Sequence, residues 1–403
     1  MTTARPVNCI IPPHLLDNLL KSDDSEIRKA ALDTMLTTTR LRGERAIRAS
    51  FTGAAAPGHG RRTVFDCRQG RILPTAALAR TEEGTAPQDT SVNHAFDGLG
   101  LTRDFYQQAL QRDSVDGMGM RLDGYVHYDQ NYNNAFWDGR QMVFGDGDGR
   151  MFTDFTAAID VIAHELTHGV TEYTAGLAYH HQPGALNESI SDVFGSLVKQ
   201  WSAHQSAETA DWLIGAEVFT PGIDADALRS LKAPGEAYDN PQFGKDPQPG
   251  HMSRYVNLPN TERGDYGGVH INSGIPNKAF YLTATRIGGF AWQAPGLIWF
   301  ESLKASSIQT QFQDFADTTY QKAEELYGAN STEQLAVLAA WHDVGIQISG
   351  VPTAIARART LAAGHNGGVG PEDGLAALSK QIGALSAQVK GLAEDVTALK
   401  SNR

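Results

Sequence analysis

The apolar positions change their spacing along the chain, and each spacing predicts a different kind of structure. Over residues 7–50 they recur at helical intervals, which predicts a short helical unit. Residues 63–150 carry short β-like runs divided by glycine and aspartate, with one helical stretch at 102–110. From residue 157 to residue 346 long helical periodicities dominate. A β-rich half that precedes a helical half predicts an α+β fold with a cleft between the halves.

Two further segments separate or extend these units. Residues 51–62 combine glycine, proline and arginine, a composition typical of places where proteases nick a chain. Residues 348–370 are rich in alanine and glycine and are interpreted as a linker to a tail at 371–403. Apolar residues of the tail follow a 3,4,3,4,3,4,3 spacing, namely at Leu375, Leu378, Ile382, Leu385, Val389, Leu392, Val396 and Leu399. This period of 3.5 predicts a left-handed coiled coil, and hence a homo-oligomer through residues 375–399. The alternative is a helix that folds back onto its own catalytic domain.

The composition is that of a globular chain and narrows its partners. The 403 residues are 41% hydrophobic, and 34 Lys+Arg against 46 Asp+Glu leave a net charge of −12. Since nucleic acid attracts basic surfaces, this acidic chain is not expected to bind it. No apolar run approaches the roughly 20 residues that a membrane span needs.

The N-terminal residues suggest where the protein resides. Residues 12–17 bring two prolines, a histidine and an aspartate into the first apolar stretch, whereas a secretory signal needs a continuous one. We therefore expect no secretory signal peptide, and either residence in the cytoplasm or export by an unconventional route. Cys9 and Cys67 are too few to staple a chain of this length. Two separate thiols are expected, and a single bridge is the alternative.

A metal site is indicated within the helical run 157–173. His164 and His168 are four residues apart, so they share one helix face and both imidazoles can reach one metal ion. Glu165 stands between them, beside any water at the metal. Glu188 follows in a second helical run, and two histidines with one glutamate are a known ligand set for catalytic zinc. The alternative is an ordinary helix with polar side chains on its surface.

Two neighbours of Glu188 fit the same site. Asp192 lies one turn after Glu188 on the same helix face, where its carboxylate can accept the second N–H group of a ligating histidine. Asn187 can serve the other histidine in the same way. The alternative is that both are ordinary polar residues of a helix surface.

Four motifs together resemble the thermolysin family of zinc metalloendopeptidases. They are NYNNAFWDGRQMVFGDGDG, HELTHGVTEYTAGLAY, GALNESISDVFGSL and GGVHINSGIPNKAFYL, and they stand in the family's order. The resemblance covers residues 63–346. The N-terminal CIIPPHLL resembles the precursor segment of the protealysin-like branch, which is shorter than the thermolysin propeptide.

The resemblance implies a two-lobed peptidase with zinc in the cleft and a short helical propeptide. The expected domains are a propeptide (1–50), a cleavable linker (51–62), a β-rich N-terminal catalytic lobe with the zinc helix (63–170), a helical C-terminal catalytic lobe (171–347), a linker (348–370) and a coiled-coil tail (371–403).

The resemblance also implies roles for individual residues. His164, His168 and Glu188 would ligate zinc. The other implied roles are the general base (Glu165), orientation of the ligating histidines (Asp192 and Asn187), hydrogen bonds to the developing oxyanion (Tyr179 and His270), fixing of the His270 ring (Asp265), contacts to the substrate backbone (Asn134, Ala135 and Arg229) and the apolar S1′ pocket (Phe152, Phe155, Val161 and Leu228).

The expected activity is that of a neutral zinc endopeptidase made as a zymogen, acting on peptide or protein substrates. An apolar S1′ pocket implies cleavage on the amino side of large hydrophobic residues. One alternative is an aminopeptidase, but we find no motif with the acidic residue that would capture a free α-amine. Another is an inert zinc scaffold that assembles through its tail, although a scaffold has no use for a general base such as Glu165.

Calcium is a further cofactor of many family members, beside the zinc helix. Asp160 and Asp211 match two of the expected ligand positions, whereas Lys199 and Ala216 occupy two others and Glu217 follows. Because a lysine brings positive charge where anionic oxygens are required, we expect no double calcium site. Lys199 is instead expected to pair with Asp160 or Asp211.

The N-terminal unit is expected to cover the cleft in the precursor and to be released by autolysis within residues 46–62. As a thiolate, Cys9 can occupy the open zinc position. The favoured interpretation is a small apolar side chain beside Ile10 and Ile11.

Overall fold

The computed structural model describes residues 8–49 and 61–351. The predicted tail at 371–403 lies outside these residues, as do most of the two linkers, so the coiled coil stays a prediction. None of the described helices is long and apolar enough to cross a membrane.

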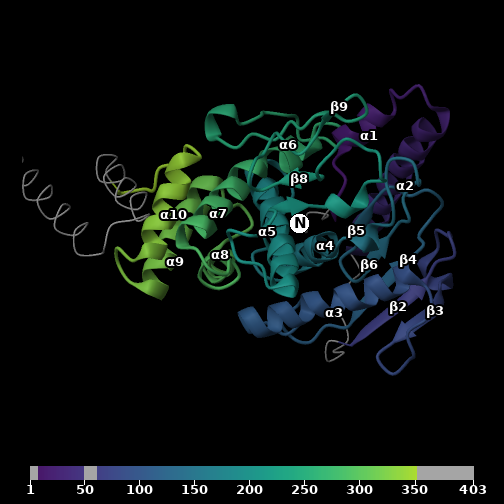
Figure 1. Cartoon of the computed structure of the whole chain (residues 1–403), viewed down its shortest axis with the longest axis horizontal. Coiled ribbons are helices and arrows are strands. Elements are labelled where there is room, and N and C mark those ends of the chain that lie inside the picture. Colours follow the sequence, from purple (N-terminus) through teal and green to yellow (C-terminus); the bar gives the residue numbers. More distant parts are fainter. Residues whose placement is uncertain (1–7, 50–60, 352–403) are drawn as a thin grey trace, which may run out of the picture. The chain divides into compact units, whose positions relative to one another are not determined.

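A six-stranded sheet forms the N-terminal lobe (Figure 1). Its strands are β1 (Asn8–Cys9), β2 (Arg62–Asp66), β3 (Ala77–Thr81), β4 (Leu122–Val126), β5 (Ala135–Trp137) and β6 (Met142–Phe144). The order across the sheet is β1-β5-β6-β4-β2-β3, so the N-terminal strand pairs with a distant part of the chain. The β-like runs predicted from the sequence are β2, β4 and β6. Short ladders elsewhere are formed by β7 (Leu213–Ile214) with β8 (Arg229–Ser230) and by β9 (Asp239–Asn240) with β10 (Gly244–Lys245).

The helices of the described residues dominate the C-terminal half. They are α1 (Pro13–Leu19), α2 (Ser25–Ala49), α3 (Thr90–Leu110), α4 (Ile159–Glu172), α5 (His181–Ala203), α6 (Asp265–Asn272), α7 (Gly274–Ile287), α8 (Ala294–Ala305), α9 (Phe312–Tyr327) and α10 (Thr332–Asp343). The sequence predicted a helix only over 102–110. The predicted start is wrong, because α3 begins at Thr90. Gly98 weakens the helical signal, but a side chain there would press a Cβ to 2.4 Å from Ile162 Cδ1 of α4.

Helices α4 and α5 carry the predicted metal ligands and pack against each other (Figure 1). Gly195 permits their close approach, since a Cβ at this position would lie 2.6 Å from the carbonyl oxygen of Asp160. The histidines of one helix therefore face the glutamate of the other across a short gap.

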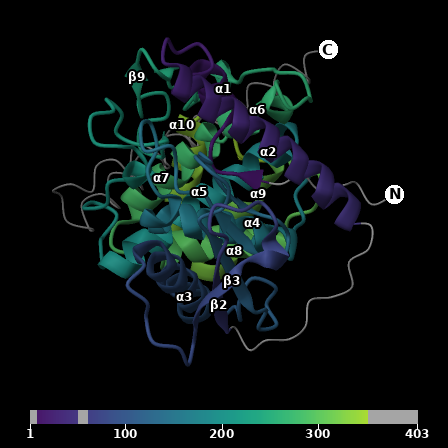
Figure 2. The same cartoon turned by 90° about the vertical axis from the view of Figure 1, so that its right-hand side faces the viewer.

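The N-terminal helices α1 and α2, drawn in purple, lie across the front of the molecule in Figure 2. Several side chains of this N-terminal unit (residues 8–49) contact the rest of the described chain, residues 61–351, which we call the catalytic half. His14 Nε2 lies 2.8 Å from the Tyr238 hydroxyl, and Asp24 pairs with Arg150 at 2.7 Å. Thr37 donates to Asp129, and Arg45 pairs with Glu172 at 2.7 Å. The contact between the N-terminal unit and the catalytic half therefore contains many polar pairs.

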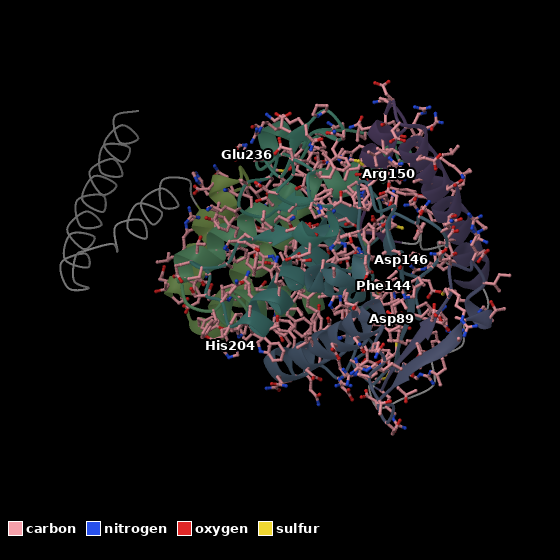
Figure 3. All side chains as sticks on the ribbon, turned by 45° about the vertical axis from the view of Figure 1, so that its right-hand side comes forward. Asp89, Phe144, Asp146, Arg150, His204 and Glu236 are labelled. Atoms are coloured by element: carbon pink, nitrogen blue, oxygen red, sulfur yellow. The ribbon has the colours of Figure 1, made fainter. Side chains whose placement is uncertain are left out.

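His127 links two parts of the N-terminal lobe. Its Nδ1 lies 2.8 Å from Asp146 Oδ1 and its Nε2 lies 3.0 Å from Asp89 Oδ2. Asp89 also caps the N-terminus of α3 by accepting from the Val92 N–H, while Asp146 follows strand β6 (Figure 3). The imidazole thus links the N-terminus of α3 to the residues that follow β6.

Candidate metal centre and substrate cleft

His164 and His168 from α4 and Glu188 from α5 meet in the protein interior, as the sequence predicts. The two Nε2 atoms are 3.0 Å apart, and they lie 3.6 Å and 3.5 Å from the nearer Glu188 oxygens. Ligands about 2.05 Å from a tetrahedral zinc are separated by roughly 3.3 Å, so this spacing fits the metal. Within the described residues Glu188 Oε2 has no hydrogen-bond partner, which also suits a ligand.

The second nitrogen of each histidine faces a polar partner. His164 Nδ1 lies 2.9 Å from Asp192 Oδ1, and His168 Nδ1 lies 2.7 Å from Asn187 Oδ1. The Ser191 hydroxyl is 3.0 Å from the same nitrogen of His168. These contacts direct both Nε2 atoms toward the gap between the helices.

Glu165 lies beside the metal group and outside the ligand set. It is completely buried, and its Oε2 accepts a hydrogen bond of 3.0 Å from the Trp137 N–H of β5. Its other oxygen, Oε1, has no hydrogen-bond partner in the described part of the chain. Burial, reinforced by the negative charge of Glu188, raises the pKa of Glu165 well above its usual value. A buried carboxylate beside the metal group, with one oxygen held by Trp137 and the other available, is suited to accept and return a proton.

Tyr179 and His270 form the opposite side of the group. The Tyr179 hydroxyl donates to Glu188 and lies 3.3 Å from His270 Nε2. Asp265 holds His270 twice, through the ring Nδ1 at 2.5 Å and through the backbone N–H at 2.8 Å. The ring is therefore fixed with Nε2 toward the cleft.

Arg229 is also part of the group, because it shares Asp192 with a predicted ligand. Its Nε donates to Asp192 Oδ2 at 2.8 Å, and Asp192 Oδ1 lies beside His164. Asn277 of α7 donates to Asp192 Oδ2 at 2.9 Å. Burial alone would raise the pKa of Asp192, but Arg229 and His164 outweigh it, so the group stays a carboxylate.

The N-terminal segment occupies the cleft beside these residues. Cys9 lies opposite Phe136 in the antiparallel pairing of β1 with β5, and its carbonyl oxygen is 3.1 Å from His270 Nε2. The backbone of Ile10 donates to the carbonyl of Ala135 at 3.3 Å and accepts from Arg229 at 3.0 Å. The Ile11 N–H donates to Asn134 Oδ1 at 3.1 Å. The segment thus uses every backbone-binding residue that the sequence predicts.

The four residues expected to line the S1′ pocket are all buried. Phe152 and Phe155 lie 5.8 Å apart between ring centroids, and Phe152 also stacks on Phe219. Their role in a pocket, like that of Val161 and Leu228, stays a prediction.

Sequence reasoning missed three residues of this region: Ser191, Asn277 and the Trp137 backbone. Ser191 stands one turn after Asn187 in the predicted helix, a spacing that could have indicated it. The other two contacts depend on how β5 and α7 meet the site, and no local spacing indicates them.

Cys9 packs as an apolar side chain. It belongs to a buried cluster that also contains Tyr132 and Phe136, and burial raises the pKa of its thiol to about 12. The favoured interpretation therefore agrees with the structure, and Cys9 is outside the group that could hold a metal. Cys9 and Cys67 are both buried thiols that form no disulfide, which confirms the expectation of separate thiols.

Lys199 pairs with both of its expected partners. Its Nζ lies 3.2 Å from Asp160, 3.0 Å from Asp211 and 3.5 Å from Glu217. An ammonium group thus lies among three carboxylates in the region where family members are expected to bind calcium. That no double calcium site forms here stays a prediction.

Comparisons with known proteins agree with the class that the site indicates. Residues 74–172 match the thermolysin metallopeptidase catalytic domain, and residues 175–346 match the thermolysin metallopeptidase alpha-helical domain. An extracellular metalloprotease of Pectobacterium carotovorum subsp. carotovorum is 45% identical over 86% of this chain and 98% of its own. Protease PrtS of a Photorhabdus strain is 42% identical over 84% and 92%. The precursor of protealysin from Serratia proteamaculans has a solved structure with TM-score 0.76 and 45% identity, covering 84% of this chain and 99% of that one.

The chain belongs to the thermolysin family of metallopeptidases and has that family's α+β fold. Within the family it is a protealysin-like zinc metalloendopeptidase with a propeptide-like N-terminal piece. The expectation of cytoplasmic residence is wrong. The Pectobacterium relative and a 40% identical relative from Serratia marcescens are both named extracellular metalloproteases, which points to export.

Proposed function

We propose that this protein is the latent precursor of a zinc endopeptidase, and that residues 8–11 inhibit it by binding in the manner of a substrate. The observation that carries the proposal is the arrangement of the Cys9–Ile10 peptide bond. Its carbonyl oxygen lies at His270 Nε2, and the N–H and C=O groups of Ile10 bond to Ala135 and Arg229. A substrate bound in this register would present its own scissile bond at the same place.

The residues around that bond suit peptide hydrolysis. Zinc held by His164, His168 and Glu188 would supply a Lewis acid that lowers the pKa of a water molecule to roughly 7. Glu165 Oε1, buried and without another partner among the described residues, would accept a proton from that water and return it to the leaving amine.

His270 and Tyr179 would stabilise the charge that develops on the scissile carbonyl oxygen. Asp265 fixes the His270 ring, so the donor is already oriented before the reaction. Preorganised donors of this kind each lower the activation free energy by about 3 kcal/mol.

The burial of Ile10 supports cleavage before a hydrophobic residue. Ile10 directly follows strand β1 (Asn8–Cys9) and is completely buried. Its backbone N–H and C=O groups bond to Ala135 and Arg229. An apolar residue therefore takes the position that follows the scissile bond.

The same preference suggests where the precursor matures. Within residues 46–62 the large apolar residues are Ile47 and Phe51. The bond before Ile47 lies within helix α2, which extends to Ala49, whereas Ser50 and Phe51 lie outside the described residues. We expect autolysis at Ser50–Phe51.

The experiment compares the wild-type precursor with Glu165→Gln on an internally quenched peptide with blocked ends. The wild type is expected to lose residues 1–50 and then to cleave peptides with Phe or Ile after the scissile bond. Glu165→Gln should bind zinc stoichiometrically yet remain uncut and inactive, because glutamine cannot accept the proton. Full peptidase activity in Glu165→Gln would refute the mechanism. Cleavage of a peptide with blocked ends would exclude an aminopeptidase, and the absence of any cleavage would favour an inert zinc scaffold.

A further inference from the structure

Arg42 of helix α2 inserts its guanidinium group into a site on the catalytic half. Only 12% of its side chain is exposed. The guanidinium pairs with the Glu262 carboxylate and lies 5.4 Å from the centre of the Tyr266 ring. A carboxylate and an aromatic face are the two groups that best bind an arginine side chain. The N-terminal unit therefore fills a ready-made site for a cation.

This site adjoins the catalytic residues. Tyr266 follows Asp265 and packs edge-on against Tyr179, with 6.0 Å between ring centroids. Asp265 and Tyr266 have positive φ values of 52° and 48°, and they continue into two glycines with φ of 89° and 81°. A run of left-handed residues is held only by its surroundings, here in part through the contacts between Asp265 and His270. The ring of Tyr266 is thus fixed beside the cleft.

The site lies on the amino-terminal side of the scissile position. Cys9 supplies the carbonyl at His270 and so occupies the position before the scissile bond. Leu41, which directly precedes Arg42 in α2, belongs to the same buried cluster as Cys9, so this part of α2 packs beside that residue. The ring of Tyr179 packs on Tyr266, and its hydroxyl lies 3.3 Å from His270 Nε2, the same nitrogen that contacts the Cys9 carbonyl oxygen.

We propose that Glu262 and Tyr266 form a substrate subsite for a basic side chain, arginine or lysine, within two residues before the scissile bond. Arg42 occupies this subsite in the precursor and vacates it when the N-terminal unit is released. The inference rests on the proposed function, because the subsite is free only in an enzyme that has lost residues 1–50. The precursor then blocks its cleft in two ways, with the backbone of residues 8–11 and with one basic side chain.

The test uses the matured enzyme and blocked, internally quenched peptides that share Phe after the scissile bond. One set places Arg, Lys, Gln, Leu or Glu directly before that bond, and a second set places them one residue earlier. In one of the two sets, Arg and Lys are expected to raise kcat/KM about tenfold over Gln, the size of one charged contact with a cation–π contact. Glu should be the poorest residue there, and added salt should reduce the preference.

Variants assign the preference to the two residues. Glu262→Gln and Tyr266→Leu are each expected to lower the Arg-to-Gln ratio several-fold, whereas Tyr266→Phe keeps the aromatic face and should retain most of it. Glu172→Gln is the matched control, because Glu172 also pairs with an arginine of α2, namely Arg45. It should leave the ratio unchanged.

Two results would overturn the subsite. One is equal cleavage of Arg and Gln peptides in both sets, and the other is a preference that survives in Glu262→Gln and Tyr266→Leu. In both cases cleavage of the Leu peptides would still support the proposed endopeptidase. Failure to cleave any peptide would overturn the proposed function itself, and the subsite with it.

Discussion

Replacing Lys199 by methionine is expected to destabilise the catalytic region, because this lysine is the cation among three carboxylates. Its ammonium lies within 3.5 Å of Asp160, Asp211 and Glu217. Burial works against the charge of Lys199, but attraction to these carboxylates outweighs it and raises the pKa of the ammonium. Methionine keeps an unbranched apolar side chain, so the variant removes the charge with little loss of packing.

Asp160 determines the size of the effect. Its side chain is fully buried, whereas those of Asp211 and Glu217 are 42% and 46% exposed and regain water readily. Breaking a buried pair by removing one partner costs about 3–5 kcal/mol. At about 2.1 cal/mol/K per residue, a folded body of roughly 300 residues has an unfolding entropy near 0.6 kcal/mol/K, so a loss of about 3 kcal/mol lowers Tm by about 5 °C.

The assay is calorimetry of the parent protein and of Lys199→Met. Both carry Glu165→Gln, which prevents autolysis during heating. Lys304→Met is the matched control, since Lys304 is 50% exposed and pairs with Glu301 on the surface of α8. Its Tm should change by about 1 °C or less. A Tm of Lys199→Met within 1 °C of the parent would refute the reasoning.

The pH dependence gives a second signature. Burial already raises the pKa of Asp160 with the lysine present, and loss of Lys199 should raise it further. The folded variant then keeps a proton that the unfolded chain releases above pH 4, so its stability falls as pH rises. The Tm deficit should therefore be larger at pH 8 than at pH 5, and an equal deficit at both would contradict this account.

Two other outcomes are expected. His127→Gln should lower the free energy of unfolding by about 1–2 kcal/mol at pH 6, allowing for partial solvent screening. The hydrogen bond to Asp146, helped by Asp89, raises the pKa of His127 to about 9, so this stabilisation is complete below about pH 6.5 and lost as pH rises through 9. Urea unfolding at pH 6, 8 and 10 measures the difference, and a constant value would contradict the role. A Cys9→Ser precursor should be as latent as the wild type, because the thiol packs among apolar side chains. Peptidase activity before any cleavage of that variant would show that the sulfur matters.

Local spacing predicted the metal group well, because its members are tied by helix geometry. His164 and His168 are one turn apart on α4, and Asp192 is one turn from Glu188 on α5. Each pair shares a helix face wherever the helix lies, so local spacing indicated each pair, whereas the meeting of the two helices depends on their packing. The family's motifs then supplied residues such as Arg229 that no spacing connects to the ligands.

Contacts that depend on packing were out of reach of such reasoning. Strand β1 contains only Asn8 and Cys9, too few residues for a periodic signal, and it exists because the edge of β5 is available. The full length of α3 was hidden by Gly98, a residue that weakens the helix but is needed for its packing on α4. The contacts of Arg42 with Glu262 and Tyr266 likewise depend on where α2 lies over the catalytic half.

Strand β1 caps one end of the six-stranded sheet, and its release has a consequence for what the enzyme can digest. Without β1, the backbone groups of Ala135–Trp137 are left as a bare sheet edge, which polypeptides recognise only in an extended conformation. A helix or tight turn on the surface of a folded protein cannot lie along that edge until it unravels. The enzyme should therefore attack unfolded chains and loose loops while sparing compact domains, and the rate of digestion of a native protein should follow how often its segments open locally.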